Sequence, residues 1–388
     1  MRKTITIGDL GTIITGKTPP TNNKNYYGDY AVFIKPTDIS EQCKFTYKTE
    51  EMYSKLAAEK YDSSLIPKGA ICVPCIGTIG TKITMAPCDC YTNQSINSIV
   101  CNESYDNEYV YYLIKNFLPG LKAYNLGTAS GREYVSKSNF EKIELVAEQD
   151  KTIQKRIGEF LSRYDSLIEN YQKQIKLLEE AAQRLYKEWF VDLHFPGHEN
   201  TKIVDGVPEG WEKKPVDTIY SIKYGKNLST KLISENGKFP VYGANGVIGY
   251  YDKANCNEQV VLITSRGNGS GDVLMTYHKD AFITNNSFIV SPIEDYSYCQ
   301  LPFTYQFLKN ANFRAVRTGA AQPQLTNQSI HTVDVVLPSK DVIIDYCDKA
   351  SYNNKKIILL NNQIRLLTEA RDRLLPKLMS DEISMFIY

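Results

Sequence analysis

Two polar stretches of the chain carry side chains suited to hydrogen bonding with DNA. Residues 124–134 match residues 314–324, and both stretches combine turn-forming residues with arginine, glutamine, serine or threonine. These side chains hold phosphates and read base edges. Because the same kind of loop occurs twice, we interpret both copies as binding loops rather than as solvated turns. The candidate contact residues in them are Arg132, Arg317, Gln322 and Gln324.

Three further basic residues lie in turns beside glycine. Lys17 and Lys226 belong to two Gly-Lys pairs, and Arg266 precedes the glycine-rich run 267–271. Glycine permits a close approach of the backbone, which leaves room for a phosphate. We therefore add these three residues to the predicted DNA contacts.

The charge balance argues for local rather than general attraction to nucleic acid. The chain has 45 Lys and Arg against 44 Asp and Glu, a formal net charge of +1. Residues 63–88 and 296–333 nevertheless contain basic side chains and no acidic ones. Sequence-independent binding requires many phosphate contacts, so the pattern favours DNA bound at two limited places.

The cysteine spacing suggests a zinc site as an alternative. Cys72-x-x-Cys75 is followed by Cys88-x-Cys90, and four thiolates can hold zinc. The matching positions of the second half lack this set, and Cys72 lies in a strand pattern where a small apolar residue suffices. We predict no metal ligands, although the sequence leaves metal binding by these cysteines open.

Other catalytic or cofactor patterns are weak. The run 267–271 resembles a nucleotide-binding turn, but the strand-like residues 273–277 follow it where a helix is required. The four histidines show no ligand spacing, and no nucleophile elbow is present. We therefore expect a tight turn between strands, no cofactor and no catalytic set.

A long helix must position these loops. Apolar residues recur at steps of three and four from Asp150 to Phe190, which predicts a helix of about 40 residues and about 60 Å. Residues 174–181 are echoed by residues 363–370 at an offset of 189. The second helix can bury its apolar stripe by running back along the first, so we expect an antiparallel coiled coil.

The remaining sequence predicts an α+β protein built as two copies of one mixed α/β globule, each followed by a long helix. Expected strands include 31–35, 70–73, 96–100, 259–264 and 282–290, with short helices at 109–117 and 302–310. The predicted segments are globule 1 (1–147), helix 1 (148–192), a linker (193–209), globule 2 (210–338) and helix 2 (339–388).

The chain resembles a known family. The segments Ile157–Leu161, Leu185–Asp192 and Val207–Glu212 are similar to the specificity subunit of type I restriction-modification enzymes. The resemblance extends over both halves. It implies that each globule is a target-recognition domain for one half of a split double-stranded DNA sequence, and that the chain itself is non-catalytic and has no cofactor.

The resemblance also implies partners. Two methyltransferase subunits are expected on the helices, and two restriction subunits can join them. The second copy departs from the pattern because Leu378-Met379 replaces Trp189-Phe190. No membrane role is expected, and the opening residues predict a cytoplasmic protein. The residues expected to dock partners are Leu185, Trp189, Phe190, Leu374 and Leu378.

Two alternatives remain open at this stage. One is a coiled-coil adaptor without a DNA role, which predicts no salt-dependent DNA binding by the assembled complex. The other is the recognition subunit of a related methyltransferase–nuclease system. No adenine methyltransferase motif of the Asn/Asp-Pro-Pro-aromatic type occurs in the chain.

Overall fold

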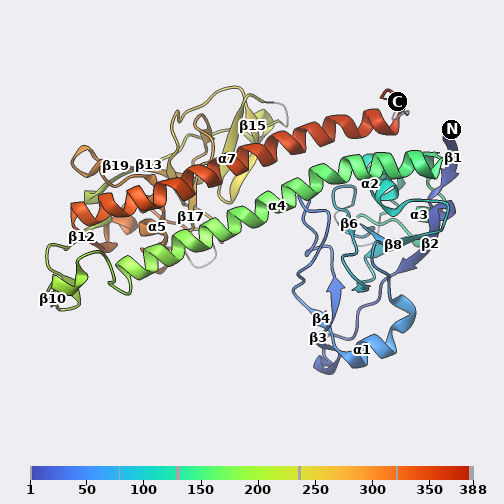
Figure 1. Ribbon diagram of the computed structural model, residues 1–388, viewed down its shortest axis with the longest axis horizontal. Helices are drawn as coiled ribbons and strands as arrows, with labels where there is room; N and C mark the ends of the chain where they lie inside the picture. The colour runs from blue at the N-terminus through green and yellow to red at the C-terminus, as the bar shows by residue number, and fades with distance from the viewer. Residues whose placement is uncertain (1, 78, 128–131, 235–236, 320–321, 384–388) are drawn as a thin grey trace. The chain divides into compact units, whose positions relative to one another are not determined.

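The computed structural model describes residues 2–77, 79–127, 132–234, 237–319 and 322–383. The chain forms two compact units, one of residues 1–170 with 364–388 (unit 1) and one of residues 171–363 (unit 2). The division cuts both long helices, so each unit holds one globule and parts of both helices. The order of the elements can be followed by colour in Figure 1.

Unit 1 contains a mixed arrangement of short strands. Among its described residues, one sheet has the order β2-β8-β5-β6, a second has the order β4-β3-β7, and β1 pairs with β9. Only the β3–β7 pairing is parallel within this described set. The strands are β1 (Arg2–Thr6), β2 (Gly11–Thr15), β3 (Tyr27–Ile34), β4 (Met52–Tyr53), β5 (Ile71–Pro74), β6 (Thr84–Met85), β7 (Tyr91–Thr92), β8 (Ile96–Cys101) and β9 (Glu144–Glu148).

Unit 2 repeats this topology. Its described sheets have the orders β13-β19-β16-β17 and β15-β14-β18, and β12 pairs with β20. The β14–β18 pairing is again parallel. The predicted internal repeat is therefore confirmed. The strands are β10 (Ile203–Val204), β11 (Val207–Pro208), β12 (Glu212–Pro215), β13 (Tyr220–Tyr224), β14 (Phe239–Gly243), β15 (Gly246–Tyr251), β16 (Val261–Thr264), β17 (Val273–Met275), β18 (Phe282–Ile283), β19 (Ser287–Pro292) and β20 (Asp334–Leu337).

Short helices begin where local capping permits. The Asp106 side chain accepts from the backbone N–H of Tyr109 at 3.1 Å, and the Ser136 side chain accepts from Asn139 at 3.2 Å. Pro302 lies in the first turn of its helix, where the missing N–H costs little. The short helices are α1 (Lys55–Lys60), α2 (Asn107–Phe117), α3 (Lys137–Glu141), α5 (Leu301–Lys309) and α6 (Asn327–His331).

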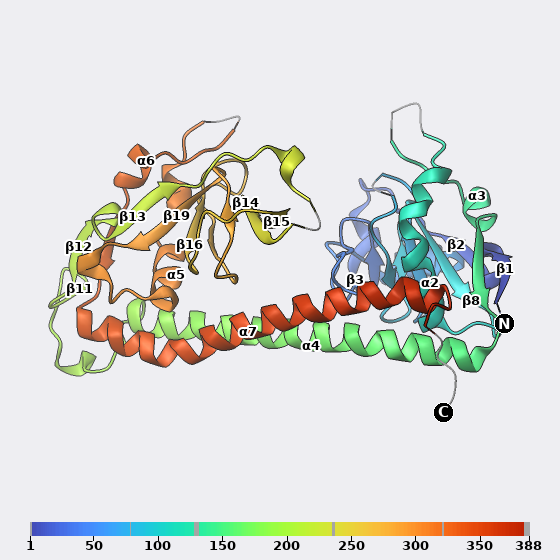
Figure 2. The same cartoon turned by 90° about the horizontal axis from the view of Figure 1, so that it is seen from above.

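The two long helices, α4 (Lys151–Phe190) and α7 (Lys340–Met379), are 40 residues each. In unit 1, Leu161 of α4 and Leu378 of α7 belong to one core. In unit 2, the rings of Trp189 and Tyr346 lie 5.8 Å apart between centroids. In each unit the start of one helix therefore lies beside the end of the other, as Figure 2 also shows. This confirms the antiparallel prediction.

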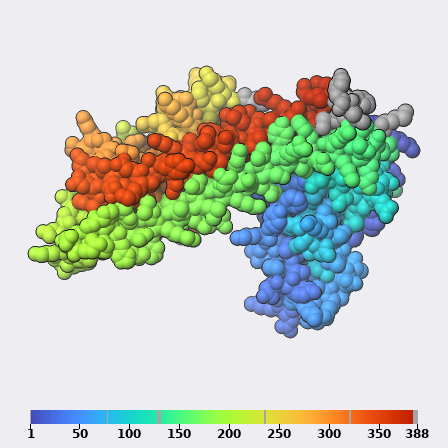
Figure 3. Space-filling view, in the orientation of Figure 1, coloured from blue at the N-terminus to red at the C-terminus, as the bar shows by residue number. Residues whose placement is uncertain are grey.

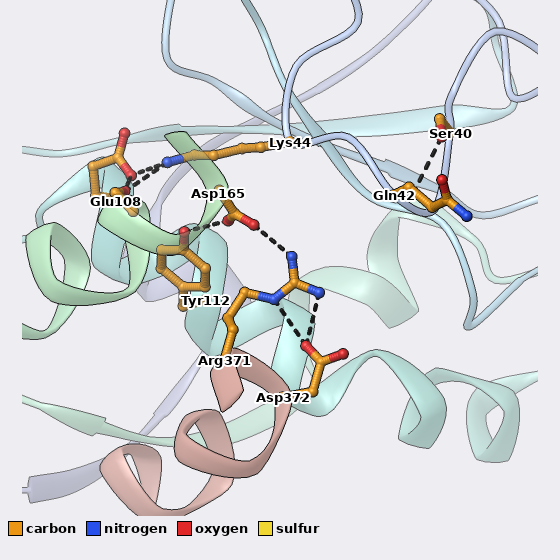
Figure 4. Close-up of polar contacts among 9 residues, drawn as sticks. Ser40, Gln42, Lys44, Glu108, Tyr112, Asp165, Arg371 and Asp372 are labelled. Atoms are coloured by element: carbon orange, nitrogen blue, oxygen red, sulfur yellow. Dashed lines mark hydrogen bonds and ion pairs between the residues drawn. The ribbon is translucent and has the colours of Figure 1, made fainter. Parts of the chain in front are cut away.

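A buried polar cluster ties both helices to the globule of unit 1 (Figure 4). Arg371 of α7 donates from Nη1 to Asp165 Oδ1 of α4 at 2.5 Å, and Asp165 also accepts from the Tyr112 hydroxyl of α2. Nearby, Lys44 forms an ion pair with Glu108. Burying these charges is tolerated because each one has a partner.

Two connections have structure of their own. Residues 193–209, expected as a polar linker, include the β10–β11 hairpin, and Phe195 packs on Trp211 with ring centroids 5.2 Å apart. The expected strand 282–290 is two strands, because a turn closed by Ser287 N–H and Thr284 O at 3.2 Å interrupts it. No described helix is both long and apolar enough to cross a bilayer.

Candidate nucleic-acid interface

The two Gly-Lys pairs occupy equivalent turns after β2 and β13. A Cβ on Gly16 would lie 2.1 Å from the carbonyl oxygen of Thr92, and a Cβ on Gly225 would lie 2.3 Å from a carbonyl oxygen of the matching turn. Such distances exclude any side chain at these positions. Lys17 and Lys226 follow, and both side chains are exposed. The repeat therefore presents one lysine at the same place in each unit.

The glycine-rich run of unit 2 is a turn between the antiparallel strands β16 and β17, as predicted. Its first residues pair with the end of the second predicted loop. Arg266 and Gln324 form a β-bridge, and Gly267 N–H donates to Pro323 O at 3.0 Å. The structure thus brings two predicted residues side by side from positions 58 apart in sequence (324 − 266).

Unit 1 has the same backbone contact with different side chains. Ile76 and Tyr134 form the equivalent β-bridge, and Gly77 N–H donates to Glu133 O at 2.9 Å. Neither Ile76 nor Tyr134 was predicted, because neither is a charged or amide side chain. Their offset of 190 from Arg266 and Gln324 is the signal in the sequence that identifies them. We call Ile76 and Tyr134 the bridge pair of unit 1, and Arg266 and Gln324 the bridge pair of unit 2.

Backbone hydrogen bonds connect the lysine turn to the bridge pair in unit 2. Ser265 N–H donates to Asn286 O at 2.8 Å, and Asn285 N–H donates to Lys226 O at 3.0 Å. Because Ser265 precedes Arg266 directly, the turn that carries Lys226 and the bridge pair share one rim of the β16–β19 sheet. The predicted residues of unit 2 are therefore parts of one surface.

The arginines of this rim differ in their partners. Both Nε and Nη2 of Arg314 lie close to Asp272 Oδ1, at 2.8 and 2.5 Å. Arg317 donates from Nε to Arg314 O at 3.0 Å. By contrast, Arg266 is exposed, and its guanidinium makes no hydrogen bond or ion pair with any described residue. Arg266 is thus an available cation, whereas Arg314 has a structural partner.

The remaining predicted residues lie on the loops facing these turns. Arg132 and Gln322 are exposed. Residues 128–131 and 320–321, which the sequence also assigned to the loops, lie outside the described residues.

The two loops close by the same hydrogen bond but differ in length. Leu126 N–H donates to Tyr134 O at 2.9 Å, and Thr318 N–H donates to Gln324 O at 2.9 Å. The closed segments are therefore 126–134 and 318–324. The ungapped match expected between the loops is wrong by two residues inside this segment, although it is right at the bridge pairs.

Three of the four cysteines considered as zinc ligands, Cys72, Cys75 and Cys90, are buried in unit 1. Burial raises the pKa of the Cys72 and Cys75 thiols to about 12. Cys88 is exposed. Across the described ranges, no group of three or more His, Cys, Asp or Glu is placed to hold a metal ion.

The residues expected to dock partners are largely occupied within the chain. Trp189 is 5% exposed in the core of unit 2, and Leu378, at the equivalent position of α7, is 1% exposed in the core of unit 1. Leu185, Phe190 and Leu374 are half-buried against the same cores. Their present contacts anchor the helix ends, so a docking role for them stays a prediction. In the space-filling view of Figure 3, atoms of both α4 and α7 lie on the visible face.

Comparison with known proteins gives one consistent result. Residues 2–180 and 208–364 match the family model described as "Type I restriction modification DNA specificity domain". The type I restriction enzyme MjaIX specificity subunit of Methanocaldococcus jannaschii is 25% identical over 405 residues, which cover 97% of this chain and 92% of that protein. The HindI specificity subunit of Haemophilus influenzae is 36% identical over 150 residues, covering 38% of this chain and 32% of that protein.

A solved structure has the same fold. The crystal structure of the S subunit of a type I restriction-modification system from M. genitalium covers 97% of this chain and 96% of its own, with a TM-score of 0.59 and 20% identity.

Proposed function

The chain belongs to the family of type I restriction-modification DNA specificity domains, and from that premise we propose that it is the DNA-recognition subunit of a type I restriction-modification complex. Each unit reads one half of a bipartite double-stranded target. The chain carries no catalytic step, and methylation and cleavage are performed by partner subunits in the cytoplasm. The related proteins named above as specificity subunits support this proposal.

The main support for the proposal is that both units have the same backbone arrangement at this rim but carry different side chains on it. Both units present a lysine after an obligatory glycine and a bridge pair beside a glycine turn. Phosphate contacts position a protein on DNA, whereas base contacts specify sequence. A shared frame with differing side chains suits two related surfaces that read different half-sites.

The proposed DNA contacts are those that line the rims of the two units. The lysines and arginines are assigned to phosphate or guanine, and the glutamines are assigned to base edges. The assigned residues are Lys17, Arg132, Lys226, Arg266, Arg317, Gln322 and Gln324.

The helices are the proposed docking surface for two methyltransferase subunits. Leu177 of α4 and Leu366 of α7 occupy equivalent positions at the offset of 189, and they are 64% and 55% exposed. A repeated apolar position on each helix fits a partner that binds twice. Restriction subunits are proposed to join the same complex.

The test is to co-express the chain with the methyltransferase subunit of its own system and to map methylated adenines in genomic DNA. The proposal predicts one split motif with an unread spacer. A complex that assembles, binds S-adenosylmethionine and methylates no site contradicts it. The isolated chain with labelled S-adenosylmethionine is the control, and it is expected to transfer no label.

A further inference from the structure

The bridge pairs are held by matching backbone contacts in the two units. Just before the bridge, Cys75 N–H donates to Ser95 O at 2.7 Å in unit 1, as Ser265 does to Asn286 at 2.8 Å in unit 2. Just after it, Val135 N–H donates to Cys75 O at 2.8 Å, and the equivalent bond in unit 2 is also 2.8 Å. The Cα positions of the two pairs are therefore fixed alike, and any difference in recognition comes from the side chains.

Those side chains have opposite chemistry. Arg266 and Gln324 are exposed and bear donors and acceptors that can form paired hydrogen bonds. Ile76 and Tyr134 are half-buried and present mainly apolar surface. In the major groove, arginine pairs with guanine and glutamine with adenine, whereas apolar side chains contact the methyl group of thymine.

The neighbouring charges fit this division. In unit 2 the nearby Arg314 is neutralised by Asp272, so Arg266 remains as a cation without a partner in the described part of the chain. In unit 1 the neighbour of Tyr134 is Glu133, whose carboxylate accepts from Ile79 N–H at 3.3 Å. An acidic neighbour disfavours a phosphate contact at that point of unit 1.

We propose that the bridge pairs are specificity-determining residues. The bridge pair of unit 2 selects a purine in its half-site, guanine at Arg266 or adenine at Gln324. The bridge pair of unit 1 selects thymine through its methyl group. This inference rests on the proposed function, because it assumes that each unit reads DNA.

The experiment uses the complex of the full chain with its methyltransferase and maps methylated adenines genome-wide for four proteins. They are the wild type, the graft Ile76→Arg with Tyr134→Gln, the variant Arg266→Ala, and the control Arg314→Ala. The wild type supplies the two half-site sequences for comparison. The graft is expected to change one base pair of the unit 1 half-site and to leave the unit 2 half-site unchanged.

The single variant covers the case in which the graft prevents folding. Arg266→Ala is expected to lower discrimination at one base pair of the unit 2 half-site by about fivefold to 150-fold, the range for losing one bidentate contact. Arg314→Ala removes a neighbouring positive charge and is expected to leave the motif unchanged. If Arg266→Ala is as selective as the wild type at every base pair of that half-site and the graft also leaves the motif unchanged, the inference is overturned.

The failures of the two proposals are distinguishable. If the assembled wild-type complex methylates no split motif, the proposed function fails. If the wild type methylates a split motif and neither the graft nor Arg266→Ala alters a base in it, the function stands and the inference about the bridge pairs is wrong.

Discussion

Replacing Arg371 by alanine is expected to loosen the attachment of the end of α7 to unit 1. The Arg371 and Asp165 side chains are each 5% exposed, and their closest N–O distance is 2.5 Å. Asp165 also accepts from Tyr112, and desolvation of this site raises the pKa of the Tyr112 hydroxyl. Removing the guanidinium therefore leaves a carboxylate that is buried and has lost its cation.

The expected magnitude follows from burial. Removing one partner of a buried ion pair costs about 3–5 kcal/mol. Arg365 on the same helix supplies the control, because it pairs with Glu369 at 2.7 Å but the two side chains are 38% and 42% exposed. An exposed i,i+4 pair contributes about 0.3–0.5 kcal/mol. Arg371→Ala is thus expected to be roughly tenfold more costly in free energy than Arg365→Ala.

Hydrogen exchange is the appropriate assay, because a chain of two units need not unfold in one step. Backbone amides of residues 364–379 are compared in wild type, Arg371→Ala and Arg365→Ala. Arg371→Ala is expected to speed their exchange at least a hundredfold. The double change Arg371→Met with Asp165→Leu is expected to recover much of the loss, because it removes both charges. Equal protection in the two single variants would contradict a stabilising role for the buried Arg371–Asp165 pair.

Among its described residues, unit 2 has no equivalent of the Arg371–Asp165 ion pair. At the helix offset of 189, Ala182 and Asn354 replace Arg371 and Asp165. Both line a cavity of about 20 Å³ in unit 2, together with Gln306 and Tyr346. This end of the helix pair is held by aromatic packing instead, including Trp189 against Tyr346.

Three further predictions concern local geometry and titration. Gly16→Ala is expected to lower the free energy of unfolding by about 1–3 kcal/mol, because its Cβ would lie 2.1 Å from a carbonyl oxygen. Gly8→Ala is the control, since the atom nearest to its Cβ is 3.3 Å away. An equal loss in denaturant titrations of both variants would contradict the structure. Iodoacetamide at pH 8 is expected to label the exposed Cys88 while Cys72, buried and with its pKa raised to about 12, stays unmodified, so peptide mass spectrometry that finds faster labelling of Cys72 would oppose this placement. Backbone N–H groups at the start of α4 lower the pKa of Asp150 from 3.8, so its stabilising effect is present above about pH 3.8 and is lost as the pH falls through the lowered folded-state pKa. The melting temperatures of wild type and Asp150→Asn are expected to differ at pH 7 and to converge below that pKa. A difference that persists below it would contradict the capping role of Asp150.

The helices were predictable because their signal is long and regular. Apolar spacing gave a helix from Asp150 to Phe190, and α4 spans Lys151–Phe190. The internal repeat was also predictable, because close backbone contacts in both units require glycine before Lys17 and before Lys226.

Short-range patterns were less informative where tertiary contacts decide. Residues 92–95 (Thr-Asn-Gln-Ser) and 284–287 (Thr-Asn-Asn-Ser) are similar in sequence, but the structure aligns them one residue apart, because Ile96 N–H donates to Asn93 O in the same way that Ser287 N–H donates to Thr284 O. Side-chain similarity at Thr92 suggested the other register. The backbone contacts alone reveal the correct one.

The candidate site was predictable in its polar half. Arg266 and Gln324 have the chemistry of base recognition, and the structure brings them together. Ile76 and Tyr134 were missed because apolar residues in a loop resemble ordinary packing. Trp189 was read as a docking residue from its motif, whereas its burial depends on the fold of unit 2.

The most direct test of two-part recognition is a domain exchange. Residues 1–147 are replaced by the equivalent segment of another family member with a different target, and adenine methylation is mapped for the complex with the methyltransferase. One half of the split motif is expected to change to that of the donor, while the other half is retained. A change in both halves would contradict the assignment of one half-site to each unit. So would a result in which the exchange of residues 1–147 changes the same half that Arg266→Ala changes.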